Sequence, residues 1–163
     1  MILLESISIK TSPTQVWEIL ADPSLMPLWN SKCTNCTPGS HSICKGSRYN
    51  AVFQMSGSGR EVACEVIECA PEQFLKTRFT GWFTPRAGYV DEVFRLHASN
   101  TETRLVHEVD FTQSGIPWLI QVLMKLVSTF GYSVGKSPLK GIKDLAENVG
   151  AKSVQATGED ARA

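Results

Sequence analysis

The sequence predicts an α+β fold in which a curved, seven-stranded antiparallel sheet wraps around a long C-terminal helix, with two short helices after the first strand. Three observations support this prediction. An alternating strand near the N-terminus leads directly into a well-capped helix, six further short segments have strand character, and a long apolar helical stretch follows them. The short segments lie too close together for the crossover helices that parallel strands need, so we expect an antiparallel sheet.

The composition fits one domain with a substantial core. The chain has 163 residues, and its 16 basic residues balance 16 acidic ones. This balance argues against nucleic acid as a partner, because binding to phosphates needs clustered basic residues in excess. No export signal precedes Glu5, so we expect a cytoplasmic location and free thiols at the five cysteines. Lys125 interrupts the most apolar stretch, residues 116–134, and we predict no transmembrane segment.

The first strand is predicted over Leu3–Ile9, where apolar and polar residues alternate. Ser12 follows as an N-cap, Pro13 occupies the first helical position, and Gln15 completes a capping-box pattern. This first helix is expected to reach about Ala21. A second short helix then starts after Asp22 and Pro23 and continues to Leu28 or Trp29.

The middle of the chain is predicted to form the remaining strands. Turn residues such as Pro38-Gly39-Ser40 and Ser56-Gly57-Ser58-Gly59 separate them. The predicted strands are Lys32–Thr37, Ser47–Met55, Arg60–Cys69, Phe74–Thr80, Tyr89–Ala98 and Thr103–Thr112.

The C-terminal helix is predicted to begin near Ile116, with Ser114 as its cap. Gly131, Gly135, Pro138 and Gly141 predict a kink or break, because these residues are poor helix formers. The domain is expected to span residues 1–149, and the polar, aperiodic tail 150–163 is expected to be disordered. An apolar face is predicted from residues spaced by three and four, namely Leu119, Ile120, Leu123, Leu126, Val127 and Phe130.

With these elements assigned, the chain resembles the START/Bet v 1-like superfamily (SRPBCC), whose bacterial members include polyketide cyclase/dehydrase-like and lipid-transport-like proteins. The resemblance implies a helix-grip fold with an internal, mostly apolar cavity between the sheet and the terminal helix. It covers about residues 2–148 and says little about activity, since such scaffolds host binders, transporters and enzymes. The residues that carry it are Ile7–Ile9, Ser12-Pro13, Val16-Trp17, Leu20, Asp22-Pro23, Trp29, Gly46-Ser47-Arg48 and Leu139–Leu145.

Strand parity predicts which residues face this cavity, because successive side chains on a strand point to opposite faces. Two ionisable residues, Glu92 and His107, fall on the otherwise apolar inner positions of their strands. They are candidates for a polar ligand anchor or an acid/base pair. The alternative is a satisfied core histidine, with Glu92 turned outward at an edge or bulge.

The loop from Gly81 to Gly88 carries Trp82 and Phe83, which form either a lid over the cavity mouth or ordinary packing on the long helix. The residues predicted to contact a ligand are Trp29, Tyr49, Phe53, Met55, Trp82, Phe83, Phe94, His107, Val109, Leu123, Val127 and Phe130.

The segment Cys33-x2-Cys36-x4-His41-x2-Cys44 has metal-like spacing, but cysteines three apart on a strand point to opposite faces, which favours structural cysteines. Cys64 and Cys69 are likewise predicted on opposite faces of one strand. We therefore predict no metal and no cofactor.

The leading functional prediction is binding or transport of a small hydrophobic or amphipathic molecule, such as a lipid, isoprenoid or polyketide-like compound. The first alternative is a polyketide cyclase/dehydratase-like or hydrolase-like enzyme with His107 as general base and Glu92 or a tyrosine as its aid. The second is a partner-docking domain that uses the Trp82 loop. The sequence does not identify the ligand or the oligomeric state.

Overall fold

The fold is described from a computed structural model of the chain. The structure describes residues 1–37, 42–55, 58–81, 84, 88–99, 101–117 and 137–159. The helix predicted from Ile116 to about residue 134 therefore lies almost wholly outside the described residues.

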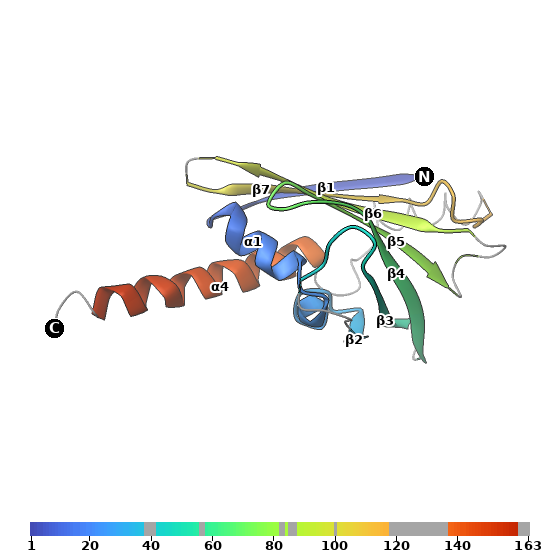
Figure 1. Ribbon diagram of the computed structural model, residues 1–163, viewed down its shortest axis with the longest axis horizontal. Coiled ribbons are helices and arrows are strands. Elements are labelled where there is room, and N and C mark those ends of the chain that lie inside the picture. The colour runs from blue at the N-terminus through green and yellow to red at the C-terminus, as the bar shows by residue number, and fades with distance from the viewer. Residues whose placement is uncertain are drawn as a thin grey trace.

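Within the described chain, seven strands form one antiparallel sheet in the order β1-β7-β6-β5-β4-β3-β2 (Figure 1). Strand β1 pairs with β7, which makes β1 and β2 the two edges and joins the N-terminal strand to the last one. All seven strands occur where the sequence predicts them. They are β1 (Ile2–Ile9), β2 (Cys33–Thr37), β3 (Arg48–Met55), β4 (Ser58–Ala70), β5 (Phe74–Gly81), β6 (Val90–Ala98) and β7 (Thr103–Asp110).

The short helices after β1 also follow the prediction. Helix α1 spans Pro13–Leu20, and the Ser12 hydroxyl accepts from the Gln15 amide at 3.4 Å. The Gln15 side-chain oxygen accepts from the Thr11 hydroxyl, whereas the predicted capping box would pair it with the Ser12 amide. A 3₁₀ turn, η1 (Pro23–Leu25), is capped by Asp22 and continues into α2 (Met26–Trp29).

Helix α4 spans Pro138–Glu159. It begins at Pro138, one of the four positions where a kink or break is expected, and then continues through Gly141. Glycine is required at position 141 because a Cβ there would lie 2.0 Å from the Trp29 carbonyl oxygen. It also extends to Glu159, into the tail expected to be disordered from Gly150. Alanine, lysine and glutamine in that stretch are good helix formers.

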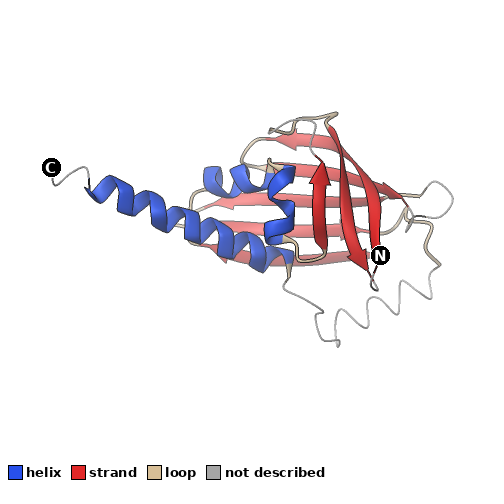
Figure 2. Ribbon diagram, turned by 90° about the horizontal axis from the view of Figure 1, so that it is seen from below, coloured by secondary structure: helices blue, strands red, loops and turns tan. Residues whose placement is uncertain are grey.

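The helices pack on one face of the sheet, which we call the inner face (Figure 2). Figure 2 shows α1, α2 and the start of α4 grouped over one end of this face, while the far end of α4 extends past the sheet. The buried side chains that join the two layers include Val16, Ile19, Leu20, Leu139, Ile142 and Ala146 from the helices and Ile9, Phe94, Leu96 and Leu105 from the sheet.

Two β-bulges change the side-chain parity that the sequence predicts. The register of β2 shifts between Cys33 and Asn35, so Cys33 pairs with Phe53 and Cys36 with Ala51, both on the inner face. The prediction that Cys33 and Cys36 point to opposite faces is therefore wrong. A second shift in β4, between Val66 and Glu68, places Cys69 opposite Leu75 and on the same face as Cys64. The prediction for Cys64 and Cys69 is wrong for the same reason. A bulge inserts one extra residue, so side chains an odd number of positions apart on the strand point to the same face of the sheet.

Candidate functional site

Four polar side chains, Tyr49, Thr77, Glu92 and His107, cross the mainly apolar inner face, and we call them the polar row. They come from β3, β5, β6 and β7. Thr77 is close enough to the Tyr49 hydroxyl to lower its pKa, against the larger effect of burial. Thr77 lies directly opposite Glu92 in the β5–β6 register, and Glu92 reaches His107 on the next strand. Four strands, β3, β5, β6 and β7, therefore place four hydrogen-bonding groups within a surface of leucine, valine and phenylalanine.

Glu92 and His107 form the closest contact of this row. Glu92 Oε1 lies 2.8 Å from His107 Nε2, and their side chains are 12% and 9% exposed. Strand β6 keeps an unbroken register with both neighbours over Glu92, so no bulge turns this carboxylate outward. The predicted pairing of the two residues is confirmed as a contact. It places a carboxylate and an imidazole together in a largely dry region, where their hydrogen bond is strengthened.

Aromatic rings hold His107 in place. The Phe94 ring stacks on the imidazole at 4.6 Å between centroids and 11° between planes. Trp29, at the end of α2, meets Phe94 edge-on at 6.1 Å and 87°. The ring order Trp29, Phe94, His107 therefore connects the helical layer to the polar row.

Trp29 has one further property. Its side chain is buried, and its Nε1 atom has no hydrogen-bond partner among the residues that the structure describes. Leaving a buried donor unsatisfied is unfavourable by about 1–3 kcal/mol, so such a group is a candidate for contact with a ligand.

Burial keeps the other hydrogen-bonding groups of this face protonated. Desolvation, followed by the nearby Cys64 and Glu92, raises the pKa of Tyr49 well above its usual value. Burial raises the pKa of Cys36 to about 12 and also raises the pKa of Cys64, with smaller effects from neighbouring thiols. These cysteines are therefore poor nucleophiles at neutral pH.

The charges on the inner face are mainly negative. Glu5 on β1 lies opposite His107, is exposed, and accepts from the Ser137 hydroxyl at 3.2 Å. Among the described inner-face positions of the strands, Arg60 is the only lysine or arginine. It is exposed, near the start of β4 and opposite Phe53.

Five of the predicted contact residues lie on the inner face, and a sixth packs against one of them. Tyr49, Phe53, Phe94, His107 and Val109 share the inner face, and Trp29 packs against Phe94. The side chain of Met55 and the residues Trp82, Phe83, Leu123, Val127 and Phe130 lie outside the described residues. Whether the Trp82 loop is a lid stays a prediction.

Sequence reasoning did not include Thr77 in the site. The signal was present, because Thr77 alternates with Leu75 and Phe79 on a predicted strand. A polar residue at an inward position of an apolar strand is the pattern that also identified Glu92.

The metal-like cysteine segment does not form a described cluster. His41 lies outside the described residues, and Cys44 is exposed, with its amide bonded to the Ser47 hydroxyl. Within the described part of the chain, no group of three or more His, Cys, Asp or Glu side chains is placed to hold a metal ion.

Two pockets lined by described residues lie away from the polar row. One, of about 300 Å³, lies between α2 and α4 beside Leu28, Gly141 and Leu145. The other, of about 570 Å³, lies at one end of β1, β6 and β7, beside Ser8, His97 and Arg104.

A curved antiparallel sheet that carries two short helices and a C-terminal helix on one face defines a helix-grip-like protein. The chain belongs to the polyketide cyclase/dehydrase and lipid transport family, whose model matches residues 3–147. Membership of this family implies a hydrophobic ligand-binding cavity. A comparison with curated proteins finds no significant match.

Solved structures share the fold at low sequence identity. The chain is similar to protein NE0264 from Nitrosomonas europaea, with a TM-score of 0.68 and 15% identity over 93% of this chain and 97% of that one. It is also similar to TTHA0849 from Thermus thermophilus, with a TM-score of 0.66 and 18% identity over 91% and 99% of the two chains. Ara h 8.0201 gives a TM-score of 0.62 and 12% identity over 90% and 97%.

No described helix combines the length and the hydropathy that crossing a membrane requires.

Proposed function

We propose that this protein binds or transports a small hydrophobic or amphipathic molecule, such as a lipid, isoprenoid or polyketide-like compound, against the inner face of its sheet. The observation that carries the proposal is the Glu92–His107 pair, which lies on a mainly apolar surface. The ligand's apolar body contacts side chains such as Phe53, Phe79 and Val109, and its polar end contacts the pair. The family's implied hydrophobic cavity supports the same assignment.

The binding energy comes mainly from the apolar contact. Burying about 300 Å² of ligand surface at about 25 cal/mol per Å² contributes roughly 7–8 kcal/mol. Association and ordering oppose this with about 4–15 kcal/mol, so area alone gives weak binding. The polar row therefore supplies orientation and selectivity in addition to the nonspecific apolar term.

Native mass spectrometry of the protein purified from its own host tests this proposal. A co-purifying apolar compound, released by denaturing extraction, is the expected result. Fluorescence titration with Nile red, an uncharged apolar dye, measures binding independently of the host.

A matched pair of variants on β7 locates the site. Val109 lies on the inner face and Val106 on the outer face, and both are half-buried. Val109→Trp fills the binding surface and is expected to weaken Nile red binding by about tenfold or more, whereas Val106→Trp leaves it within about twofold. Equal effects from the two substitutions would place the dye elsewhere and contradict the proposal.

A second candidate function is catalysis by the same pair, as a cyclase, dehydratase or hydrolase. The 2.8 Å contact favours it, because a carboxylate that bonds one imidazole nitrogen orients the ring for general acid–base work. In this mechanism His107 acts as the base, and a protonated group, Tyr49 or the protonated form of Glu92, polarises a carbonyl. A His107→Gln variant that retains ligand affinity but loses conversion of that ligand identifies an enzyme. Unchanged ligand after incubation with the wild-type protein identifies a carrier.

A further inference from the structure

We infer that the ligand presents an uncharged oxygen group, a hydroxyl or a carbonyl, to the polar row, and that the site rejects a free carboxylate of the same size. This inference rests on the proposed function, and it names the class of compound that the inner face accepts. It separates alcohols, phenols and ketones from ionised fatty acids.

The first argument is the charge around the Glu92–His107 pair. With Glu92 ionised, the pair has a net charge of zero or minus one. Glu5, opposite His107 on the edge strand, adds another carboxylate on the same face. Arg60 is exposed and opposite Phe53, near the first residue of β4, and it offers a cation only near that end of the sheet. An anionic ligand group at the pair would therefore lie beside the largely buried Glu92 carboxylate, with the exposed Glu5 on the same face, which is unfavourable.

The second argument is where the described cations of the neighbouring strands lie. Lys76 and Arg78 of β5 bind Asp91, and Arg95 of β6 binds Glu108. These pairs lie on the outer face, since their positions alternate with Thr77, Glu92 and Phe94. The sheet separates them from the polar row, and each already has a carboxylate partner.

The third argument is the hydrogen-bonding capacity on the inner side. Glu92 accepts hydrogen bonds, and a hydroxyl that donates to a carboxylate forms a charge-assisted bond. Trp29 Nε1 is a buried donor with no partner among the described residues. The Trp29 ring contacts Phe94, and Phe94 stacks on His107, so the donor belongs to a side chain one ring away from the pair. A hydroxyl oxygen both donates and accepts, so it matches this combination, and a carbonyl oxygen satisfies the Trp29 donor.

Displacement of Nile red by a length-matched series tests the inference at pH 8, with 1-decanol, methyl decanoate, decanoate and decylamine as competitors. The expected result is displacement by the alcohol and the ester at concentrations at least about tenfold lower than by decanoate. Equal displacement, or preference for decanoate, overturns the inference. Preference for decylamine also overturns it, because the site then selects a cation.

Variants connect the selectivity to the named residues. Glu92→Gln removes the negative charge and is expected to reduce the alcohol-over-decanoate preference by about threefold or more. Glu65→Gln, on the outer face and paired with Arg48, is the matched control and leaves the preference unchanged. Trp29→Phe keeps an aromatic ring but removes the donor, and it is expected to weaken displacement by the ester by about threefold or more. A preference unchanged in Glu92→Gln overturns the assignment to Glu92.

The wild-type series decides between neutral and charged ligands even where a variant fails to fold. Failure of Nile red and of all four compounds to bind overturns the proposed function, and this inference with it. Binding of the series with the wrong order overturns the inference alone.

Discussion

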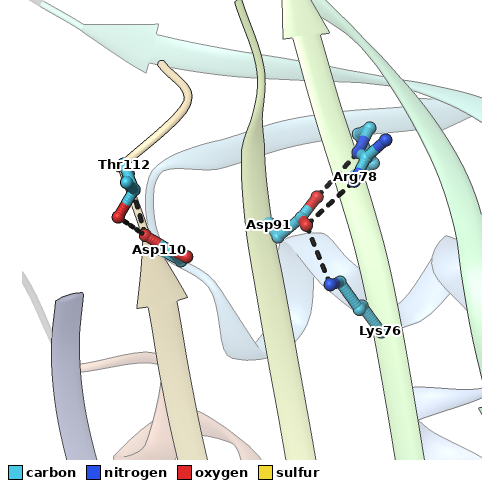
Figure 3. A network of polar contacts seen from close by, with 5 residues as sticks. All are labelled: Lys76, Arg78, Asp91, Asp110 and Thr112. Atoms are coloured by element: carbon cyan, nitrogen blue, oxygen red, sulfur yellow. Dashed lines mark hydrogen bonds and ion pairs between the residues drawn. The ribbon is translucent and has the colours of Figure 1, made fainter. Parts of the chain in front are cut away.

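Arg78 and Asp91 form a two-pronged ion pair across β5 and β6 on the outer face of the sheet (Figure 3). Arg78 Nε lies 2.8 Å from Asp91 Oδ1, and its Nη2 lies 3.0 Å from Oδ2. Lys76 Nζ adds a contact at 2.9 Å, and the Arg78 guanidinium also covers the Tyr89 ring at 3.6 Å. The paired residues continue a row of charges through the sheet register, in the order Arg48, Glu65, Arg78, Asp91 and Asp110.

Two aspartates are neighbours in this row, because Asp91 lies opposite Asp110 in the β6–β7 register. Figure 3 shows how the structure accommodates them: Asp91 faces Arg78 and Lys76, while Asp110 bonds Thr112. The Thr112 amide donates to Asp110 Oδ1 at 2.8 Å, and the Thr112 hydroxyl donates to the same oxygen. Each carboxylate has its own donors, which reduces the repulsion between them.

We predict that the Arg78–Asp91 pair makes stability depend on pH in the acid range. Burial raises the pKa of Asp91, but hydrogen bonds from Arg78 and Lys76 outweigh it, so the pKa lies below its usual value. A carboxyl with a lowered folded-state pKa contributes stability above its unfolded pKa of about 4 and loses it as the pH falls through the folded value. Chemical denaturation between pH 7 and pH 2 is expected to show this loss of stability below about pH 4. In Asp91→Asn, the free energy of unfolding is expected to fall less over the same pH range.

The exposed end of the same row supplies the control. Asp91→Ala is expected to reduce the free energy of unfolding at pH 7 by about 2–3 kcal/mol, because it leaves partly buried cations without their carboxylate. Arg48→Ala removes a 3.2 Å pair in which Arg48 is 76% exposed, and it is expected to change stability by less than about 1 kcal/mol. If both variants lost similar free energy of unfolding, the burial of an ion pair in this row would not determine its contribution to stability.

Close packing between α2 and α4 gives a second prediction. Gly141→Ala improves helix propensity by about 1 kcal/mol, yet its Cβ would lie 2.0 Å from the Trp29 carbonyl oxygen. Backbone atoms cannot move aside without shifting α2. The net effect is expected to be a loss of about 1–3 kcal/mol in thermal or chemical denaturation. Lys140→Ala, at the adjacent exposed position, is expected to have little effect, and a stabilised Gly141→Ala protein would contradict the contact.

The strands and the first helices could be predicted from sequence because their signals are local. Alternation, turn residues and the Ser12 cap depend on residues near one another in the chain. The positions of Glu92 and His107 followed from the same alternation, since their strands have no described bulge. These are the parts of the site that sequence reasoning identified.

The remaining features depend on contacts between distant segments. The bulges that bring Cys36 and Cys69 to the inner face exist only relative to the partner strands β3 and β5. Glycine is needed at position 141 because the helix there packs closely on the backbone of Trp29, which lies more than a hundred residues earlier in the chain. The Trp29 Nε1 donor has no partner among the described residues, and no local sequence pattern predicts this, because the neighbouring residues do not differ from those around a tryptophan whose Nε1 is hydrogen-bonded.

The contact between Glu92 and His107 predicts a measurable energetic coupling. Both side chains are about nine-tenths buried, and a hydrogen bond of this kind contributes roughly 1.5–3 kcal/mol when one partner is charged. A double-mutant cycle with Glu92→Gln and His107→Gln is expected to give a coupling of at least about 1 kcal/mol in urea denaturation. A cycle on Glu92 and Thr103, which is buried but bonds the Thr11 carbonyl, is expected to give none. Additive losses in the first cycle would contradict the pair.

Thiol reactivity provides the final prediction, since it measures the inner face directly. Cys33, Cys36 and Cys64 are buried, and burial raises the pKa of all three, whereas Cys44 is exposed. Iodoacetamide reacts with the thiolate, so Cys44 is expected to be alkylated at least about tenfold faster at pH 8 than the three buried thiols. Peptide mass spectrometry over a time course assigns the rate to each cysteine. Denaturation in urea is expected to equalise the rates, and a Cys44→Ser protein is expected to lose the fast phase. Rapid labelling of Cys36 or Cys64 in the folded protein would mean that solvent reaches the inner face. It would contradict the burial of the polar row, on which the proposed binding site depends.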